Sequence, residues 1–159
     1  MADVHSKVIR SKNMSAIRDA DTKPELAVRR SLHAMGFRFR LHCKKLLGTP
    51  DIVLPRYKVV IFVNGCFWHK HDCEVFRLPA TRTDWWNRKL TANRLRDEAV
   101  QDKLRESGWR VMVIWECGLK GRNRILSEER NSFISRWVRE AGSSYVEIPA
   151  PMNLLRNKS

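Results

Sequence analysis

The stretch VVIFVNGCFWHKHDC, residues 59–73, decides the fold of this chain. Its first five residues are all apolar and predict a buried strand. A second apolar run, VMVIW at 111–115, predicts another buried strand and is closely followed by Cys117. If these strands are neighbours that end at the same edge of a sheet, Cys117 meets the loop that runs from Cys66 to Cys73. Three thiols and an imidazole in one place predict a tetrahedral zinc site.

The loop contains two histidines, and a zinc site of this kind needs only one of them. Spacing alone does not choose between His69 and His71. His71 lies two residues before Cys73, which suits a metal ligand, whereas Trp68 beside His69 suggests that this side of the loop faces a substrate. The histidine that remains free could act as a general acid or base, because imidazole titrates near neutral pH.

The charge of the chain points to nucleic acid. Its 159 residues suit one domain, and 31 Lys and Arg against 17 Asp and Glu give a formal net charge of +14. Such an excess predicts attraction to phosphate backbones and binding that weakens steeply with salt. No apolar run is long enough to span a membrane, and the first residues do not look like a signal peptide. We therefore expect a reducing cytoplasm, where cysteines bind metal more often than they form disulfides.

The order of elements predicts an α/β fold with a small mixed central sheet flanked by helices. Helices are expected at 22–35, 83–107 and 127–140, and strands at 37–41, 51–54, 59–63 and 109–115. In the first helix, Thr22 and Glu25 have the spacing of a capping box, while Arg29 and Arg30 are expected to face outward. The chain then divides into a basic arm (1–20), a domain with the zinc loop (21–142) and a C-terminal tail (143–159).

Asp51 is a candidate ligand for a catalytic cation. It opens an apolar strand, where a carboxylate can hold Mg²⁺ together with water and phosphate oxygens. The alternative is a simple turn aspartate after Pro50. A hairpin between 51–54 and 59–63 would bring Asp51 beside Val63, Asn64 and the zinc loop, and this company favours the metal hypothesis.

Aromatic and polar side chains near the loop admit two interpretations. Phe67, Trp68, Trp85 and Trp86 could pack into the core, or they could wedge between base pairs and unstack them. In the helix at 83–107, Asn93, Arg94, Arg96 and Asp97 lie around one face, for which solvated charge is the usual explanation.

Several motifs together resemble the very-short-patch-repair (Vsr) mismatch endonucleases. The likeness covers roughly residues 5 to 140, and the combination of Cys-Phe-Trp-His with a distant Trp-Glu-Cys is highly specific. The matching motifs are RSKNM at 10–14, GTPD at 48–51, NGCFWH at 64–69, ATRT at 80–83, the segment 93–97 and GWRV…WEC at 108–117.

The resemblance implies a three-layer restriction-endonuclease-like fold with a structural zinc ion. It also implies a Mg²⁺-dependent enzyme that nicks duplex DNA 5′ of the thymine in a T·G mismatch, the product of 5-methylcytosine deamination. By the same resemblance we expect a monomer in the bacterial cytoplasm, associated with the nucleoid, with a mismatch-repair protein as a possible partner.

Carried over by position, Asp51 resembles the magnesium-binding catalytic aspartate, assisted by the main-chain carbonyl of Val63. His69 resembles the catalytic histidine, and Glu25 and Asp97 resemble carboxylates near the metal and that histidine. The residues that resemble the zinc ligands are Cys66, His71, Cys73 and Cys117. Those that resemble the wedge or other DNA contacts are Phe67, Trp68, Trp86, Asn93, Arg10 and Lys12.

Two positions depart from the pattern of some family members, which carry Thr at 63 and His at 64 where this chain has Val63 and Asn64. A main-chain carbonyl survives the first change, but the second removes an imidazole that could contact phosphate or move a proton. Two other hypotheses stay open: a zinc-stapled duplex-binding module without catalysis, and a nicking nuclease for another distorted duplex.

Overall fold

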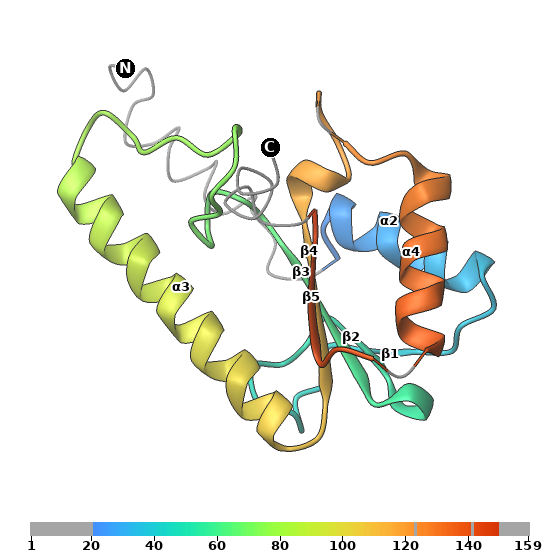
Figure 1. The fold of residues 1–159 in the computed structure, drawn as a ribbon. Coiled ribbons are helices and arrows are strands. Elements are labelled where there is room, and N and C mark those ends of the chain that lie inside the picture. Colours follow the sequence, from blue (N-terminus) through green and yellow to red (C-terminus); the bar gives the residue numbers. More distant parts are fainter. Residues whose placement is uncertain (1–20, 123, 141, 150–159) are drawn as a thin grey trace.

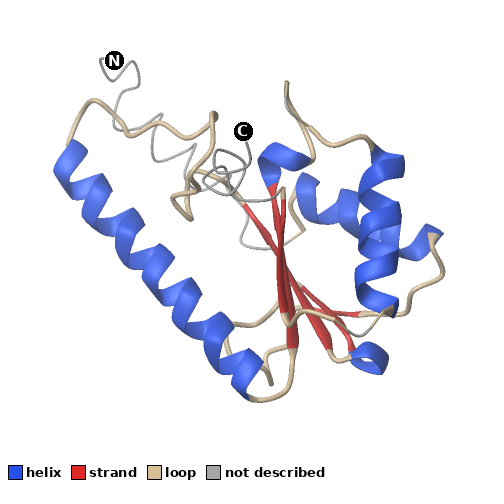
Figure 2. Ribbon diagram, viewed as in Figure 1, coloured by secondary structure: helices blue, strands red, loops and turns tan. Residues whose placement is uncertain are grey.

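The structure, a computed structural model, describes residues 21–122, 124–140 and 142–149. The predicted basic arm, with Arg10 and Lys12, lies outside these residues. Five strands form one mixed sheet, with helices on both of its faces (Figures 1 and 2). The strands are β1 Arg40–Leu41, β2 Ile52–Leu54, β3 Val59–Asn64, β4 Arg110–Trp115 and β5 Tyr145–Ile148. The helices are α2 Lys23–Ala34, α3 Thr83–Glu106 and α4 Ser127–Arg139, with short 3₁₀ turns η1 Pro55–Tyr57 and η2 Glu116–Gly118.

The strands are ordered in space as they are in sequence, β1-β2-β3-β4-β5. The pairs β1–β2 and β2–β3 are antiparallel, whereas β3–β4 and β4–β5 are parallel. In the β3–β4 pair, Asn64 lies opposite Trp115, so the two strands end at the same edge. This register confirms the prediction that the segments after residues 64 and 115 leave the sheet side by side.

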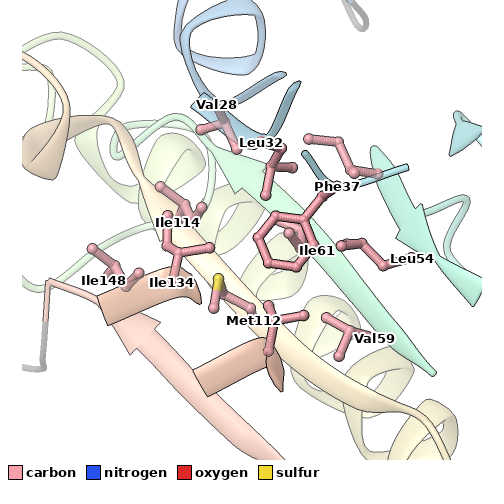
Figure 3. Packing of buried hydrophobic residues seen from close by; sticks show 12 residues of the cluster. Val28, Leu32, Phe37, Leu54, Val59, Ile61, Met112, Ile114, Ile134 and Ile148 are labelled. Carbon is pink, nitrogen blue, oxygen red and sulfur yellow. The ribbon is translucent and has the colours of Figure 1, made fainter. Parts of the chain in front are cut away.

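The core lies on both faces of the sheet. Helices α2 and α4 cover one face, and the long α3 lies along the other (Figure 1). On the first face, Val28 and Leu32 from α2 and Ile134 from α4 pack onto Ile61 and Ile114 of the central strands (Figure 3). The hydrophobic cluster on the second face is smaller, and it joins the sheet to α3 and to the loop cysteines. The side chains in that cluster are Val53, Val60, Cys66, Leu104, Val111, Val113, Trp115 and Cys117.

The mixed α/β class is confirmed, but the predicted C-terminal boundary is wrong. Strand β5 lies within the segment predicted as a tail, 143–159, and pairs along β4 from Tyr145 to Ile148. The strand has only four residues and pairs with β4 alone, and Glu147 interrupts its apolar pattern, so its local signal is weak. Among the described helices, none is long and apolar enough to cross a membrane.

Candidate active site and metal centre

Four potential metal ligands meet where β3 and β4 end. One donor atom from each of the four lies within 4.8 Å of the others, and the set is Cys66, His71, Cys73 and Cys117. Cys66 follows β3 and Cys117 lies in η2 after β4, so the parallel register brings them together. Three sulfurs and one nitrogen are a donor set that tetrahedral Zn²⁺ prefers, so these residues fit a structural metal ion. Of the two histidines in the loop, it is His71 that joins this group.

The thiols of the cluster are already polarised. A hydrogen bond with the Cys117 thiol is the main cause that lowers the pKa of Cys66 to about 4, and His71 acts in the same direction. The same interaction with Cys66 raises the pKa of Cys117, which keeps the proton that the pair shares. Metal ions bind thiolates rather than thiols, so the lowered pKa of Cys66 favours metal binding.

The loop is fixed around its histidine. The main-chain N–H of His71 donates to the carbonyl of Cys66 (2.9 Å), and the N–H of Cys73 donates to the carbonyl of His71 (3.0 Å). The His71 ring stacks on Trp115 of β4, with centroids 3.9 Å apart and planes 5° from parallel. Trp115 in turn donates its indole N–H to the Glu147 carboxylate of β5 (3.2 Å). Strand β5, which the sequence did not predict, therefore supports the metal cluster.

Asp51 lies where the chain enters β2, and its side chain is tied to the end of β3. The main-chain N–H of Val63 donates to its Oδ2 atom (2.8 Å), as the predicted hairpin requires. Burial is the main cause that raises its pKa to about 7, and the negative charge of Glu25 adds to the rise. The Val63 N–H and His42 act in the opposite direction. A buried carboxylate beside a second carboxylate is stabilised in its charged form by a bound cation.

The turn before Asp51 needs glycine. Gly48 has a φ of +75°, and a Cβ atom there would lie 2.3 Å from a methyl carbon of Val100 on α3. The loop therefore packs closely against α3 and holds Asp51 at the mouth of β2.

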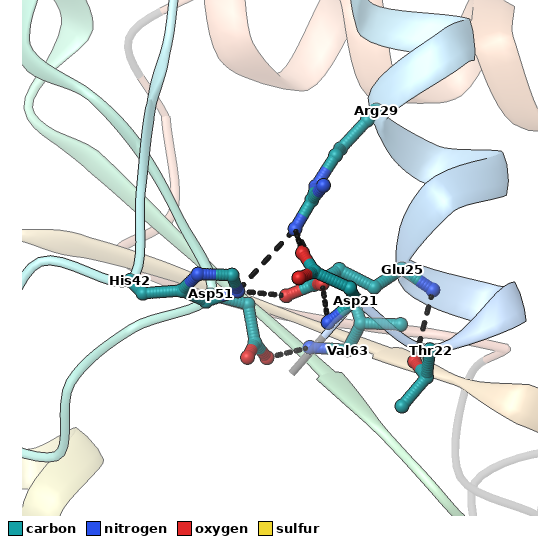
Figure 4. Close-up of polar contacts among 7 residues, drawn as sticks. All are labelled: Asp21, Thr22, Glu25, Arg29, His42, Asp51 and Val63. Carbon is teal, nitrogen blue, oxygen red and sulfur yellow. Dashed lines mark hydrogen bonds and ion pairs between the residues drawn. The ribbon is translucent and has the colours of Figure 1, made fainter. Parts of the chain in front are cut away.

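Glu25 does more than cap its helix. The Thr22 hydroxyl accepts a hydrogen bond from the Glu25 N–H (3.3 Å), which is one half of the predicted capping box. The Glu25 side chain accepts instead from the N–H of Asp21 (2.6 Å), and it pairs with Arg29 (2.6 Å) and His42 (2.8 Å) (Figure 4). With only 2% of its surface exposed, Glu25 forms a buried acidic site together with Asp51.

Sequence reasoning missed two residues of this acidic site. Arg29 was expected to face outward, but it pairs with the Glu25 and Asp21 carboxylates and is only 15% exposed. The spacing of four residues between Glu25 and Arg29 was an available signal for their ion pair. No local pattern marked His42, whose contact with Glu25 joins two separate elements.

His69 lies in the same loop but makes a different contact. Its Nδ1 atom is hydrogen-bonded to the carboxylate of Asp97 on α3, and about a third of each side chain is exposed. Both residues line a cavity of about 250 Å³ that also includes Asn64. A carboxylate that holds one ring nitrogen fixes the orientation of the imidazole, so its second nitrogen can take part in proton transfer. The structure brings together this predicted pair, and His69 is not one of the four residues of the Cys/His cluster, although His71 lines the same cavity.

The predicted wedge residues form one aromatic cluster. Phe67 contacts Trp68 (ring centroids 5.0 Å apart) and Trp86 (5.4 Å). Trp85 packs edge-on against Trp86 (4.9 Å), is 37% exposed and carries Arg82 over its ring. Aromatic faces flanked by cations are typical of surfaces that bind nucleic acid.

The predicted DNA contact Asn93 supports this cluster from α3. Its side-chain amide donates to the main-chain carbonyl of Trp68 (3.3 Å). Phe76, which no motif had marked, stacks on Phe67 with ring centroids 6.3 Å apart. The aromatic rings are therefore held by both the loop and the long helix.

A Cys/His cluster that could hold a metal ion, two neighbouring carboxylates, an oriented imidazole and a basic aromatic face are together typical of a metal-dependent enzyme that cleaves DNA. Comparison with known proteins agrees with this class. The family model described as DNA mismatch endonuclease Vsr matches residues 2–75.

Three relatives extend the match over most of the chain. It is 44% identical to the DNA mismatch endonuclease Vsr of Escherichia coli (strain K12) over 144 residues, and this aligned region covers 91% of this chain and 92% of that protein. It is 48% identical over 118 residues to the Type II nicking enzyme V.XorIIP of Xanthomonas oryzae pv. oryzae (74% and 87%). It is 40% identical over 141 residues to the Type II nicking enzyme V.NmeAIP of Neisseria meningitidis serogroup A (89% and 99%).

The chain belongs to the Vsr family of DNA mismatch endonucleases. The prediction of a DNA nicking endonuclease, a phosphodiester hydrolase of very-short-patch mismatch repair, is confirmed at the level of the family.

Proposed function

We propose that this enzyme nicks one strand of duplex DNA 5′ of the thymine in a T·G mismatch, with Mg²⁺ bound at Asp51. The observation that carries the proposal is the Asp51 carboxylate, which the Val63 N–H anchors (2.8 Å) at the end of β3 beside Glu25. The residues fit a hard cation, because two carboxylates converge there and the main-chain carbonyl of Val63 can add an oxygen ligand. When bound, Mg²⁺ neutralises charge on the scissile phosphate and on the leaving 3′ oxygen.

We assign proton transfer to His69. Its contact with Asp97 holds Nδ1, so Nε2 is the atom that would accept a proton from the attacking water or pass one to the leaving group. Asp97 is then a positioning residue, since it acts through the imidazole. This chain has Asn64 where some family members carry a histidine, and His71 belongs to the Cys/His cluster. His69 is therefore the histidine of the loop that is available for acid–base chemistry.

Recognition of the mismatch is assigned to the aromatic cluster. Phe67, Trp68 and Trp86 would insert beside the T·G pair, which is easier to unstack than a fully paired step. Asn93 would support Trp68 through the hydrogen bond to its carbonyl. We also assign DNA contacts to Arg10 and Lys12, which lie outside the described residues.

The remaining assignments follow from the family. We propose that Zn²⁺ occupies the cluster of Cys66, His71, Cys73 and Cys117 in a structural role, which the S₃N donor set supports. We propose that the three layers are a restriction-endonuclease-like fold. The enzyme would act as a monomer in the bacterial cytoplasm, at the nucleoid, with a mismatch-repair protein as its partner.

A nicking assay tests the proposal. A duplex with one T·G pair and a label on the thymine strand is incubated with and without Mg²⁺, beside fully paired duplexes of the same sequence. We expect one product that depends on both the mismatch and Mg²⁺. Asp51→Ala should bind the duplex but not cleave it, whereas Asp102→Ala, which removes an exposed aspartate of α3, should cleave normally.

Three results would contradict the proposal. Cleavage by Asp51→Ala at the wild-type rate would remove Asp51 from the mechanism. Tight binding with no product at any divalent metal concentration would favour a zinc-stapled binding module. Equal cleavage of other distorted duplexes would keep the nuclease and change its target.

A further inference from the structure

His42 occupies an unusual position next to the buried acidic site. It follows β1 directly and has a φ of +45°, in the left-handed region that side chains other than glycine rarely adopt. Residues that are held in such a conformation gather at functional sites, where the surrounding structure over-determines them. The contacts of His42 show what this conformation brings together.

Those contacts join the two carboxylate residues of the site. The main-chain N–H of His42 donates to the main-chain carbonyl of Asp51 (3.0 Å). Its ring atom Nε2 lies 2.8 Å from Oε1 of Glu25, which comes from α2 on the other side of the cluster (Figure 4). One residue thus ties the strand that carries Asp51 to the helix that carries Glu25.

The two oxygens of Glu25 are held by different partners. Oε2 accepts from the main-chain N–H of Asp21 (2.6 Å) and from the guanidinium of Arg29 (2.6 Å). Among the described residues, Oε1 has its hydrogen bond from His42. Without that bond, the Glu25 carboxylate, which is only 2% exposed, still has Asp51 as a neighbour but loses the contact that fixes Oε1, so it is free to rotate.

We propose that His42 is a positioning residue of the nicking site, which fixes the Glu25 carboxylate beside Asp51 and so raises the affinity of the site for its divalent cation. The inference rests on the proposed function, because it takes Asp51 as the cation ligand. Groups that orient a metal site from the next layer change its affinity or activity by about 10- to 100-fold. Arg29 binds the other oxygen of Glu25 and also lies 3.3 Å from Nε2 of His42, so it does not replace the contact that His42 makes with Oε1.

Three substitutions separate positioning from a merely structural role. His42→Gly suits the positive φ and keeps the main-chain N–H that bonds to Asp51, but it removes the ring. His42→Gln keeps a donor that can reach Oε1, whereas His42→Asn also tolerates the backbone conformation but carries a shorter amide. His33→Ala, on the exposed end of α2, is the matched control for loss of a histidine.

The first measurement is Mn²⁺ binding to the zinc-loaded protein, followed by electron paramagnetic resonance of the free ion. We expect binding at least about 10-fold weaker in His42→Gly and His42→Asn, and within about 3-fold of wild type in His42→Gln. His33→Ala should match wild type. The second measurement is nicking, where His42→Gly should need about 10-fold more Mg²⁺ for its half-maximal rate at an unchanged KM for DNA.

Wild-type Mn²⁺ affinity in folded His42→Gly, or in His42→Asn if the glycine variant does not fold, would overturn the inference. Failure of His42→Gln to restore binding would also overturn it, because the role would then not depend on a donor to Glu25. Asp51→Ala tests the proposed metal site independently of the role of His42. If Asp51→Ala binds Mn²⁺ as wild type does, the proposed metal site itself fails.

Discussion

Asp51→Asn should make the metal-free enzyme more stable while it abolishes nicking. Burial and Glu25 raise the pKa of Asp51 from 3.8 to about 7, so the ionised form is disfavoured in the folded state. Asparagine carries no charge, and its side-chain oxygen can still accept the hydrogen bond from Val63. The substitution therefore removes a cost to folding that the wild-type protein bears at the proposed cation site.

The sign and size of the effect follow from proton linkage. Below pH 3.8, Asp51 is protonated in both the folded and the unfolded state, and its ionisation costs nothing. As the pH rises from 3.8 to about 7, the unfolded chain loses this proton and the folded chain keeps it, so the free energy of unfolding falls. Above about pH 7, Asp51 is ionised in both states, and its contribution to the free energy of unfolding no longer changes with pH. At about 1.4 kcal/mol per pH unit, the ceiling is about 4 kcal/mol. Because Asp51 is only partly buried and solvent screens part of this cost, we expect about 2 kcal/mol.

Thermal unfolding of the zinc-loaded, magnesium-free protein, followed by circular dichroism, measures this difference. At about pH 8.5 the Tm of Asp51→Asn should exceed that of wild type by about 4–8 °C, and the gap should shrink toward about pH 4. Millimolar Mg²⁺ should raise the Tm of wild type but not of the variant. A variant that is less stable than wild type at high pH, or a gap that does not change with pH, would refute the reasoning.

Other substitutions test the remaining parts of the site. Cys117→Ser should lose the zinc ion and at least about 3 kcal/mol of stability, measured by metal analysis and thermal unfolding. Cys43→Ser, at a cysteine outside the cluster, should keep both the zinc ion and the stability. An unchanged zinc content in Cys117→Ser would contradict the proposed zinc site. His69→Ala should lower the single-turnover nicking rate by about 10²- to 10⁴-fold with DNA affinity retained, and undiminished nicking would exclude its proposed role. Asp97→Asn should lower the same rate by about 10-fold or more, because the imidazole loses the carboxylate that orients it, and an unchanged rate would exclude this positioning role. Trp86→Ala should reduce the preference for T·G over paired duplex by about 10-fold, measured as a ratio of kcat/KM, whereas an equal loss on both duplexes would speak against a wedge.

The central part of the fold could be predicted because its signals are local. The apolar runs at 59–63 and 111–115 are buried strands, and the cysteines that follow them indicated that these strands end together. The edges of the sheet carry weaker signals. Strand β1 has only two residues. Strand β5 includes Glu147, whose carboxylate accepts a hydrogen bond from Trp115 of β4. That contact exists only in the folded sheet, so no pattern of neighbouring residues reveals it.

The candidate site divides in the same way. Cys66, Cys73 and one of the two histidines between them could be predicted because thiols and imidazoles at short spacing are rare outside metal sites. The structure then chose His71 over His69, which spacing could not do. His42 was missed, because its partner lies seventeen residues away on another element and because a single histidine after a short strand matches no motif.

The positions of the four cluster residues along the chain also determine when the cluster can form during translation. Cys66, His71 and Cys73 leave the ribosome together, but Cys117 is joined to the nascent chain only after the whole of α3 has been made. A truncated product that ends before β4 therefore lacks both the fourth ligand and the parallel neighbour of β3. A fragment that ends before Cys117 cannot complete the cluster, so the loop between Cys66 and Cys73 can be braced only after translation has passed η2.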